Sequence, residues 1–170
     1  MRLVLLLCGA LLLTSCGYHV SNHVDALPKK VHTIAIPAFD NLTIRYKLSD
    51  QLPANIAREF ITRSRYRVVA DPNQADAVLR GAVTNYISYP TVFDQSTGRA
   101  SGVQMSVFLQ LNLVDRQTGA VLFTRPSMEV RQRYEISVDQ QKYFEESDVG
   151  LERLSKDVAK TVVSAILEAF

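Results

Sequence analysis

Cysteine is scarce in this chain of 170 residues, and both copies, Cys8 and Cys16, lie near its start. Beyond Cys16 there is no thiol, which excludes a disulfide framework, a cysteine nucleophile and cysteine metal ligands from the rest of the chain. Histidine occurs three times, and only His19 and His23 lie near each other. Their spacing of four residues suits a metal ion on a helix, but no third ligand is near, so solvated histidines are favoured over a metal site.

The sequence also lacks the glycine and serine motifs of common enzymes. Its seven glycines form no phosphate-binding loop, and no serine lies in a Gly-x-Ser-x-Gly pattern. Acidic residues do cluster at Glu145, Glu146, Asp148 and Glu152. The start of a helix explains this cluster, because carboxylates are stabilised at the positive end of the helix dipole. Without a catalytic constellation, we predict that the protein is not an enzyme and has no cofactor or metal.

Long hydrophobic runs are confined to the first residues. Arg2 precedes an apolar stretch at 3–13, which is too short to span a hydrocarbon core of ~30 Å as a helix. A positive charge, a short apolar run and small residues are typical of an export signal, so we predict that residues 1–15 are removed. Their loss leaves a nearly neutral chain, which argues against nucleic-acid binding through bulk charge.

The apolar run ends in Leu13-Thr14-Ser15-Cys16, which resembles the lipobox of bacterial lipoproteins. In that class the cysteine thiol receives a diacylglycerol and its amino group a further acyl chain such as palmitate, which together form a stable membrane anchor. The alternative is an ordinary signal peptide with a chance cysteine. Gly17, rather than an aspartate, follows Cys16. By resemblance to lipoprotein sorting, this residue favours the outer membrane of a Gram-negative-type bacterium.

The remaining 155 residues suit one domain, which we place at 31–170 behind a polar, lipidated tether at 16–30. Apolar stripes at helical spacing predict one helix from about 49 to 64, with Ser49 as N-cap and Pro53 near its first turn. They predict a second helix from about 148 to 170, with Ser147 as N-cap. β-branched and alternating apolar residues predict strands at 31–39, 65–70, 78–89, 103–114 and 120–134, with a hairpin tip at 90–102 and a tight turn at 115–119.

These elements define the fold class. A strand, a helix and a strand in this order imply a parallel pair, whereas the later strands joined by turns are antiparallel, so the sheet is mixed. The strand at 103–114 alternates between apolar and polar residues, which indicates one buried and one open face. We therefore predict an α+β fold, a two-layer sandwich with two helices packed on one face of a mixed four- to five-stranded sheet.

The last predicted strand carries several arginines. Arg125, Arg131 and Arg133 have the same parity and therefore point to one face if no bulge intervenes. Pro126 marks either a bulge or an edge in this strand. Guanidinium groups bind phosphates, but a solvated strand face, partly neutralised by Glu129, explains the pattern as well.

Two more cations lie close to this strand in the predicted fold, Arg99 at the hairpin tip and Lys142 after the strand. The tip also carries aromatic and apolar side chains, which are either interface anchors or cover for the edge of the sheet. These side chains are Tyr86, Tyr89, Pro90, Val92 and Phe93.

Four segments resemble those of the LptE family, the lipopolysaccharide-assembly lipoproteins. They are CGYHV at 16–20, IAIPAFDNLT at 34–43, ADAVLRGAVTNY at 75–86 and LNLVDRQTGAVL at 111–122. The resemblance implies a sheet with two helices on one face, a lipid anchor at the inner leaflet of the outer membrane and no covalent reaction. It also implies that the protein plugs the lumen of the β-barrel translocon LptD, helps that barrel to assemble and binds lipopolysaccharide during its delivery to the outer leaflet.

The resemblance also suggests roles for individual residues. At the hairpin tip Phe93 matches an aromatic residue of the family, Asp94 stands where a basic residue is expected, and Arg99 is the substitute on the other side of the loop. The candidates for lipopolysaccharide binding are Arg99, Arg125, Arg131, Arg133 and Lys142. The candidates for barrel contact are Tyr89, Phe93, Gln104, Ser106, Gln110 and Asn112. Two other functions stay open, a pilot or scaffold lipoprotein for another envelope complex such as a secretion pore, without lipid binding, and a free-standing glycolipid-binding protein.

Overall fold

The structure is a computed structural model that describes residues 27–28, 30–135 and 140–170, with side chains from Val149 onward in the last range. Cys16, His19 and His23 lie outside the described residues, together with the predicted leader and most of the predicted tether. The elements in chain order are β1 (Thr33–Ala35), β2 (Asp40–Asn41), α2 (Lys47–Arg63), β3 (Arg67–Val69), the short 3-10 helix η1 (Pro72–Gln74), β4 (Ala77–Phe93), β5 (Ala100–Asp115), β6 (Val121–Glu135) and α3 (Gln140–Leu167).

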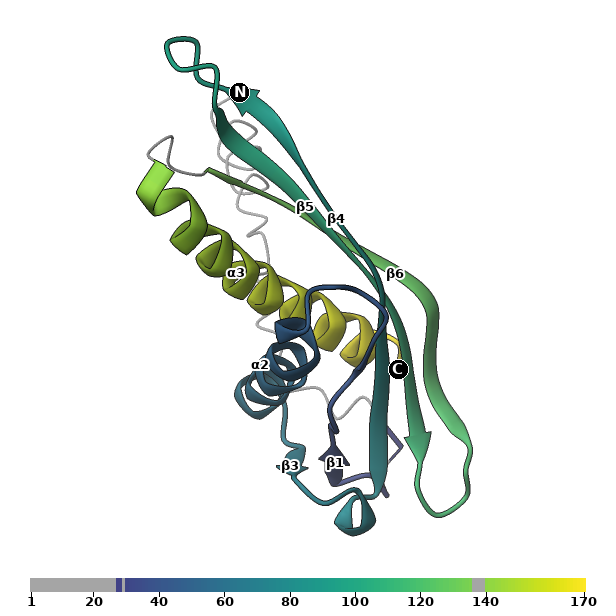
Figure 1. The fold of residues 1–170 in the computed structure, drawn as a ribbon. Helices are drawn as coiled ribbons and strands as arrows, with labels where there is room; N and C mark the ends of the chain where they lie inside the picture. The colour runs from purple at the N-terminus through teal and green to yellow at the C-terminus, as the bar shows by residue number, and fades with distance from the viewer. Residues whose placement is uncertain (1–26, 29, 136–139) are drawn as a thin grey trace, which may run out of the picture.

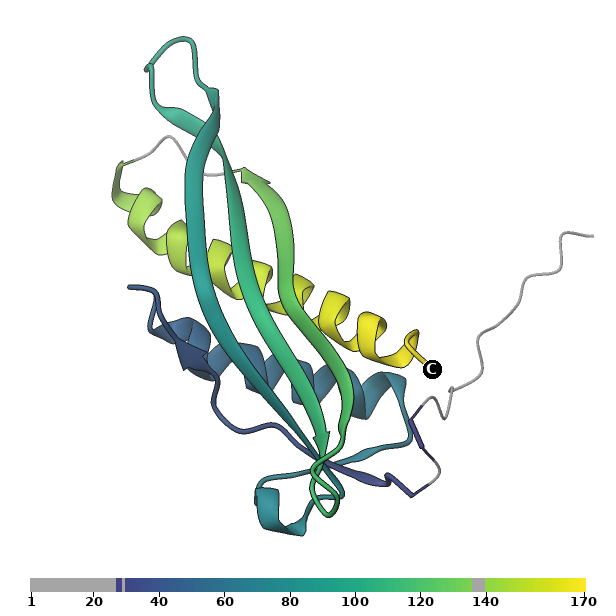
Figure 2. The same cartoon turned by 90° about the vertical axis from the view of Figure 1, so that its right-hand side faces the viewer.

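The strands form one mixed sheet in the order β3-β1-β4-β5-β6, with β2 also paired to β4. β1 is parallel to β3 and β4, whereas β4, β5 and β6 are antiparallel neighbours. The sheet has six strands rather than four or five, because the strand predicted at 31–39 is shortened to β1, before Pro37, and residues 40 and 41 beyond it form the additional short strand β2. Both helices lie on the same side of the sheet (Figures 1 and 2), and the predicted α+β class is confirmed.

The hairpin of β4 and β5 is longer than the sequence predicts and projects past the helices (Figure 1). Only residues 94–99 form its loop, instead of 90–102, because Pro90 is accommodated within β4. Beyond Val83, β4 has β5 as a partner on one side only, so the missing N–H of a proline need not disrupt a ladder. Close by, the N–H of Tyr86 donates to Oδ1 of Asn85 at 2.8 Å. A proline and a side-chain acceptor protect this strand edge against pairing with another chain.

Both helices begin earlier than predicted. α3 begins at Gln140, so Ser147 lies inside the helix and is not its N-cap. α2 begins at Lys47 and contains Pro53 in its interior, where the ring removes the N–H that would bond the carbonyl of Ser49. The N–H of Phe39 donates to that Ser49 carbonyl instead, at 3.3 Å. A backbone group of the segment between β1 and β2 therefore completes the helix at its proline.

The core lies between the sheet and the two helices. Its β5 side chains follow the predicted alternation, and the helical ones come from the apolar stripes. The largest fully buried side chains include Ile34, Leu48, Leu52, Ile56, Phe60, Leu79, Leu109, Leu111, Leu113, Leu154 and Ile166. At Gly81 in β4 the ring of Phe39 comes so close that an added Cβ would lie 2.5 Å from it. Glycine is required there because the ring packs directly on the strand backbone.

The turns at the two ends of β5 have the same construction. Asp94 and Asp115 each begin an Asp-x-x-Thr-Gly segment, and in each the aspartate Oδ1 accepts the threonine N–H, at 2.8 and 2.9 Å. The glycines, Gly98 and Gly119, have φ values of 67° and 72°, which a side chain rarely adopts. The predicted tight turn at 115–119 is confirmed, and the distal tip repeats it.

The described start of the chain packs on the domain. Leu27 is buried, and its N–H donates to the hydroxyl of Tyr66 at 2.8 Å. The ammonium of Lys30 forms an ion pair with the carboxylate of Asp115. Folded contacts therefore begin within the segment predicted as tether. Among the described helices, none combines the length and the apolar character that crossing a bilayer would take.

Candidate functional site

The side of the sheet that faces away from the helices carries a group of polar and aromatic side chains on the distal halves of β4, β5 and β6. Cross-strand pairing arranges them in rows, one made of Ile87, Ser106 and Arg131 and the next of Tyr89, Gln104 and Arg133. Residues in such a row point to the same face of a sheet. We call these six residues the distal open face. It contains five of the residues predicted for barrel contact or lipopolysaccharide binding, namely Tyr89, Gln104, Ser106, Arg131 and Arg133.

The distal open face contains one engaged and one unengaged guanidinium group. Arg131 donates from Nε and Nη2 to Oε1 of Glu129, at 3.1 and 2.7 Å, and this contact raises the pKa of Arg131 above its ordinary value. Arg133 is exposed and has no ion pair to any described residue. Beside it, Nε2 of Gln104 donates to the hydroxyl of Tyr89 at 2.6 Å. Of the two arginines, Arg133 is therefore the more available to an anion.

Arg125 does not belong to this face, because the condition for the three arginines to share one face, a strand without a bulge, is not met. The β5–β6 register shifts between Leu109 and Leu111, where two residues of β6, including Pro126, oppose one residue of β5. Such a bulge reverses the side-chain alternation on either side of it. Arg125 pairs with the fully buried Leu111 and lies over the ring of Phe123, with Cζ 5.5 Å from its centroid. It therefore lies on the helix side of the sheet, at the edge.

The polar residues predicted on β5 differ in accessibility. Gln110 and Asn112 are exposed, and Oδ1 of Asn112 accepts the hydroxyl of Thr124 on β6 at 2.7 Å. Ser106, by contrast, is only 3% exposed between its row neighbours Ile87 and Arg131. A partner on this face would therefore meet Gln110 and Asn112, but not the hydroxyl of Ser106.

The hairpin tip presents apolar side chains on a well-ordered turn. Phe93 is 57% exposed and Val92 47% exposed, whereas Tyr86 packs partly against the core. Asp94 stabilises the turn, because its Oδ1 accepts four hydrogen bonds from the backbone N–H and hydroxyl groups of Ser96 and Thr97. These bonds lower the pKa of Asp94 from 3.8 to about 2. Its acidic side chain thus has a structural role in the turn.

The two remaining cations predicted for lipid binding are Arg99 and Lys142. Arg99 is exposed at the end of the tip loop, and its carbonyl accepts the N–H of Asp94 at 2.8 Å. Lys142 falls in the first turn of α3, where side chains lie outside the described residues. Arg99 and Arg133 are separated along β5 by roughly 15 Å, since Ala100 follows Arg99 and Gln104 pairs with Arg133.

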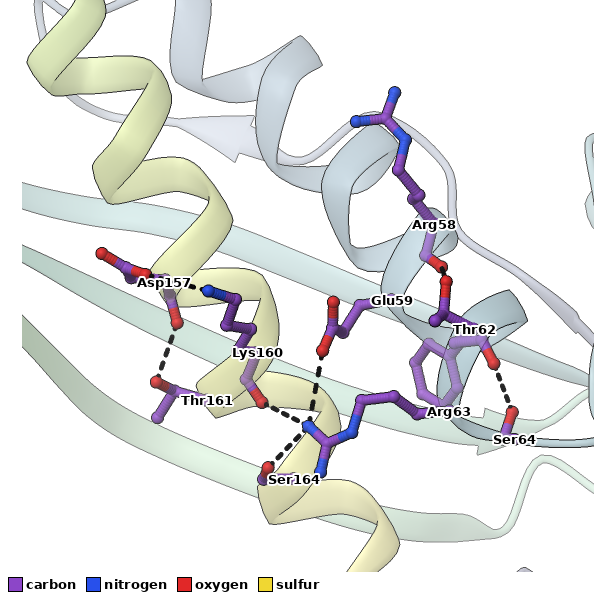
Figure 3. Close-up of polar contacts among 10 residues, drawn as sticks. Arg58, Glu59, Thr62, Arg63, Ser64, Asp157, Lys160, Thr161 and Ser164 are labelled. Carbon is purple, nitrogen blue, oxygen red and sulfur yellow. Dashed lines mark hydrogen bonds and ion pairs between the residues drawn. The ribbon is translucent and has the colours of Figure 1, made fainter. Parts of the chain in front are cut away.

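The far side of the molecule, between the two helices, is closed by polar contacts (Figure 3). Nη1 of Arg63 on α2 donates to Oγ of Ser164 at 2.8 Å and to the carbonyl of Lys160 at 3.4 Å. A cavity of about 170 Å³ lies in the same groove, lined by Asn55, Arg58, Glu59, Lys156, Ala159 and Lys160. Both lysines already pair with carboxylates of their own helix. We regard this groove as a helix–helix contact and not as a ligand site.

The structure also has an exposed apolar segment that the sequence analysis missed. Leu42, Ile44 and Tyr46, in the loop between β2 and α2, are 72–90% exposed. The sequence gives one signal for this segment. These apolar residues lie between a predicted turn and a predicted helix, outside every element whose apolar face is expected to be buried.

Several solved structures share this fold. PelC, a dodecamer from Paraburkholderia phytofirmans, has a TM-score of 0.54 at 18% identity, over 86% of this chain and 94% of that chain. Rare lipoprotein B from Shewanella oneidensis has a TM-score of 0.50 at 12% identity, over 81% and 95%. Lipoprotein B from Nitrosomonas europaea has a TM-score of 0.50 at 18% identity, over 89% and 88%. The domain thus has a fold that occurs in bacterial lipoproteins, and at these identities the likeness shows the fold alone.

The sequence identifies the family within this class. The model of the LptE family, described as lipopolysaccharide-assembly, matches residues 31–166. The chain belongs to this family, so the resemblance of its four segments is confirmed. No curated protein matches the chain.

Proposed function

We propose that this protein is a lipoprotein of the outer membrane that forms a complex with the barrel LptD, plugs its lumen, aids its assembly and binds lipopolysaccharide on the way to the outer leaflet. The match of the LptE family over residues 31–166 carries this proposal. In this proposal residues 1–15 are a leader, Cys16 carries the lipid anchor, and the role is binding without catalysis.

The shape and surface of the domain support the role of a plug. The lumen of a large membrane barrel is polar, so a plug needs side chains that form hydrogen bonds at its surface. Gln104, Gln110 and Asn112 supply such groups on the side of the sheet that no described helix covers. β4 has 17 residues and is roughly 55 Å long, which exceeds the ~30 Å thickness of a hydrocarbon core. A domain of this length inside the barrel would reach across the membrane.

The distal end of the sheet supports the lipid-binding part. Lipopolysaccharide is an amphiphile with phosphate groups and acyl chains. Arg133 on the distal open face offers a guanidinium for a phosphate, and Arg99 lies further towards the tip. Val92 and Phe93 at the tip offer apolar surface to an acyl chain. We place the lipid contact at this end of the hairpin.

The test of the complex is a purification of the acylated protein from native envelopes in mild detergent, followed by mass spectrometry of the proteins that accompany it. We expect one large barrel of the lipopolysaccharide translocon in stoichiometric amount. Cys16→Ala should still bind the barrel in detergent, since it changes the anchor and not the domain, but should lose its membrane retention in cells that lack the barrel. A secretion pore in place of the barrel would support a pilot or scaffold role, and no partner at all would exclude both.

A further inference from the structure

The loop between β2 and α2 carries the three most exposed large hydrophobic side chains of the described residues. Leu42 is 76% exposed, Ile44 90% and Tyr46 72%, and the next in order is Ile61 on α2 at 62%. One exposed apolar side chain is ordinary, but several together mark an interaction site. We call residues 42–46 the apolar loop.

Hydrogen bonds within the apolar loop hold its backbone in one shape. Oδ1 of Asn41 accepts the N–H and the hydroxyl of Thr43, at 2.9 and 2.8 Å, and Nδ2 of Asn41 donates to the carbonyl of Arg45 at 2.8 Å. The N–H of Arg45 donates to the hydroxyl of Thr43 at 3.1 Å. The polar side chains are used inside the loop, and the apolar ones point away from it. A loop that is already ordered loses little conformational entropy on binding, which favours affinity.

The apolar loop is also fixed to the sheet. The N–H of Leu42 donates to the carbonyl of Val83 at 2.9 Å, directly beyond the β2–β4 pairing. The guanidinium of Arg45 lies over the ring of Tyr86, with Cζ 5.3 Å from its centroid. Figure 2 shows this dark blue segment, just before α2, at the side of the elongated molecule and about halfway along it. The exposed side chains therefore project from a flank and not from an end.

This position discriminates between the surfaces that the apolar loop could meet. A bilayer that touched it would have to lie along a flank that also carries the exposed Arg45 and Asp50. A second strand added to the adjacent edge of β4 is opposed by Pro90 and by the Asn85 side chain that already occupies an edge N–H. The wall of a barrel that encloses the domain, by contrast, would run parallel to the long axis of the domain and meet its flanks.

We propose that the apolar loop is a docking contact through which this protein binds an apolar recess in the wall of its barrel partner. This inference rests on the proposed function. Leu42, Ile44 and Tyr46 insert into the recess, and Arg45 faces its polar rim. Tyrosine and arginine are enriched among the residues that dominate protein interfaces. The contact would bury the apolar side chains of the loop, which are exposed to water in the free protein.

Photo-crosslinking in intact cells tests the proposal on the acylated chain. A benzophenone amino acid replaces Ile44 in one variant, Phe93 in a second and Ile61, on α2, in a third. We expect a covalent product with the barrel from position 44. A product from position 93 but not from 44 would overturn this inference and leave the proposed function intact. A product of position 44 with a phospholipid or with a second copy of this chain would also overturn it. Absence of the barrel from all three products and from the purification described above would remove the proposed function itself.

A matched pair of substitutions measures the contribution to affinity. Ile44→Asp should reduce the barrel recovered with the protein at least fivefold, whereas Ile61→Asp, which changes an exposed isoleucine outside the loop, should leave recovery unchanged. The thermal midpoint of the unacylated Ile44→Asp chain should equal that of the parent, because the side chain contacts little in the free protein. An equal loss in both variants, or none in Ile44→Asp, would contradict the proposal.

Discussion

Asp94 and Asp115 show how one residue type shapes the turns at both ends of β5. Each uses one carboxylate oxygen to gather the N–H groups of the following residues, and a glycine with positive φ closes the turn. The sequence marks both turns with the same Asp-x-x-Thr-Gly pattern, yet only the second was predicted as a tight turn. At the first, Pro90 suggested a longer loop from 90 to 102, whereas an aspartate that accepts local hydrogen bonds closes a shorter one.

The ionisation of Asp94 makes the distal turn sensitive to acid. Its pKa is about 2 in the folded protein, against an ordinary value of 3.8, because the turn donates four hydrogen bonds to the charged form. The unfolded chain therefore takes up a proton at higher pH than the folded one. The stabilisation is complete above about pH 4 and is lost as the pH falls towards 2.

Carboxyl chemical shifts measured by NMR as a function of pH check this prediction at Asp94. We expect a midpoint near 2 and, at the same pH, faster hydrogen exchange of the Ser96 and Thr97 amides. Asp94→Asn keeps an acceptor oxygen but cannot ionise, so the protection of these two amides, measured relative to their intrinsic exchange rates at each pH, should no longer change in this range. A midpoint at the ordinary value would show that the four hydrogen bonds do not form in solution.

At the scale of elements, the sequence predicted what depends on hydrophobic periodicity and missed what depends on backbone pairing. The alternation along β5 and the stripes of α2 and α3 predicted most of the side chains that form the core, because apolar side chains are buried on one face of each element. Ile61 at the margin of the α2 stripe is an exception and is 62% exposed. Residue parity puts Arg125 on the same face as Arg131 and Arg133 only in a regular strand. A bulge near Pro126 adds one unpaired residue to β6 and thereby moves Arg125 to the other face. Pro90 likewise suggested a loop, because the sequence does not reveal that one side of β4 has no partner there.

The contact between the helices provides a prediction at this scale. Nδ2 of Asn55 on α2 donates to Oγ of Ser155 on α3 at 2.9 Å, and Ser155 is fully buried. Asn55→Ala should lower the free energy of unfolding by about 1–2 kcal/mol, because it leaves a buried hydroxyl without this partner. Arg63→Ala removes contacts at an exposed position and should cost less than about 1 kcal/mol.

Urea unfolding of the two variants as unacylated chains measures the difference. The transition should shift further for Asn55→Ala than for Arg63→Ala, with the same dependence on denaturant concentration in both. The reverse order would mean that the exposed contacts in Figure 3, and not the buried hydroxyl, hold the helices together.

For the whole molecule, arginines on opposite sides of the sheet make it possible to distinguish binding at a defined site from attraction by net charge. Arg133 lies on the distal open face and Arg125 on the helix side, although both are exposed arginines of β6. Binding of purified lipopolysaccharide to the acylated protein at low salt should weaken severalfold in Arg133→Ala and stay unchanged in Arg125→Ala. The effect should shrink as salt is added, because screening shortens the range of the charge.

Fluorescence titration of both variants at two ionic strengths measures these affinities. Equal losses would indicate attraction by net charge without a defined site, and no loss in either would remove the arginines from the lipid contact. The sequence could not supply this pair of variants, because parity places both arginines on one face unless a bulge intervenes, and the sequence left open whether Pro126 marks a bulge or an edge.

The hydrogen bond between Phe39 and the Ser49 carbonyl has a consequence for the order in which the chain folds. An isolated peptide with the sequence of α2 would have a gap in its hydrogen-bond ladder at Pro53, and short helices are marginal in water even without such a gap. α2 gains its missing partner only when the segment between β1 and β2 lies against it, with the Phe39 ring already on Gly81. We therefore expect the helix and strand layers to form together, because Phe39 contacts both of them.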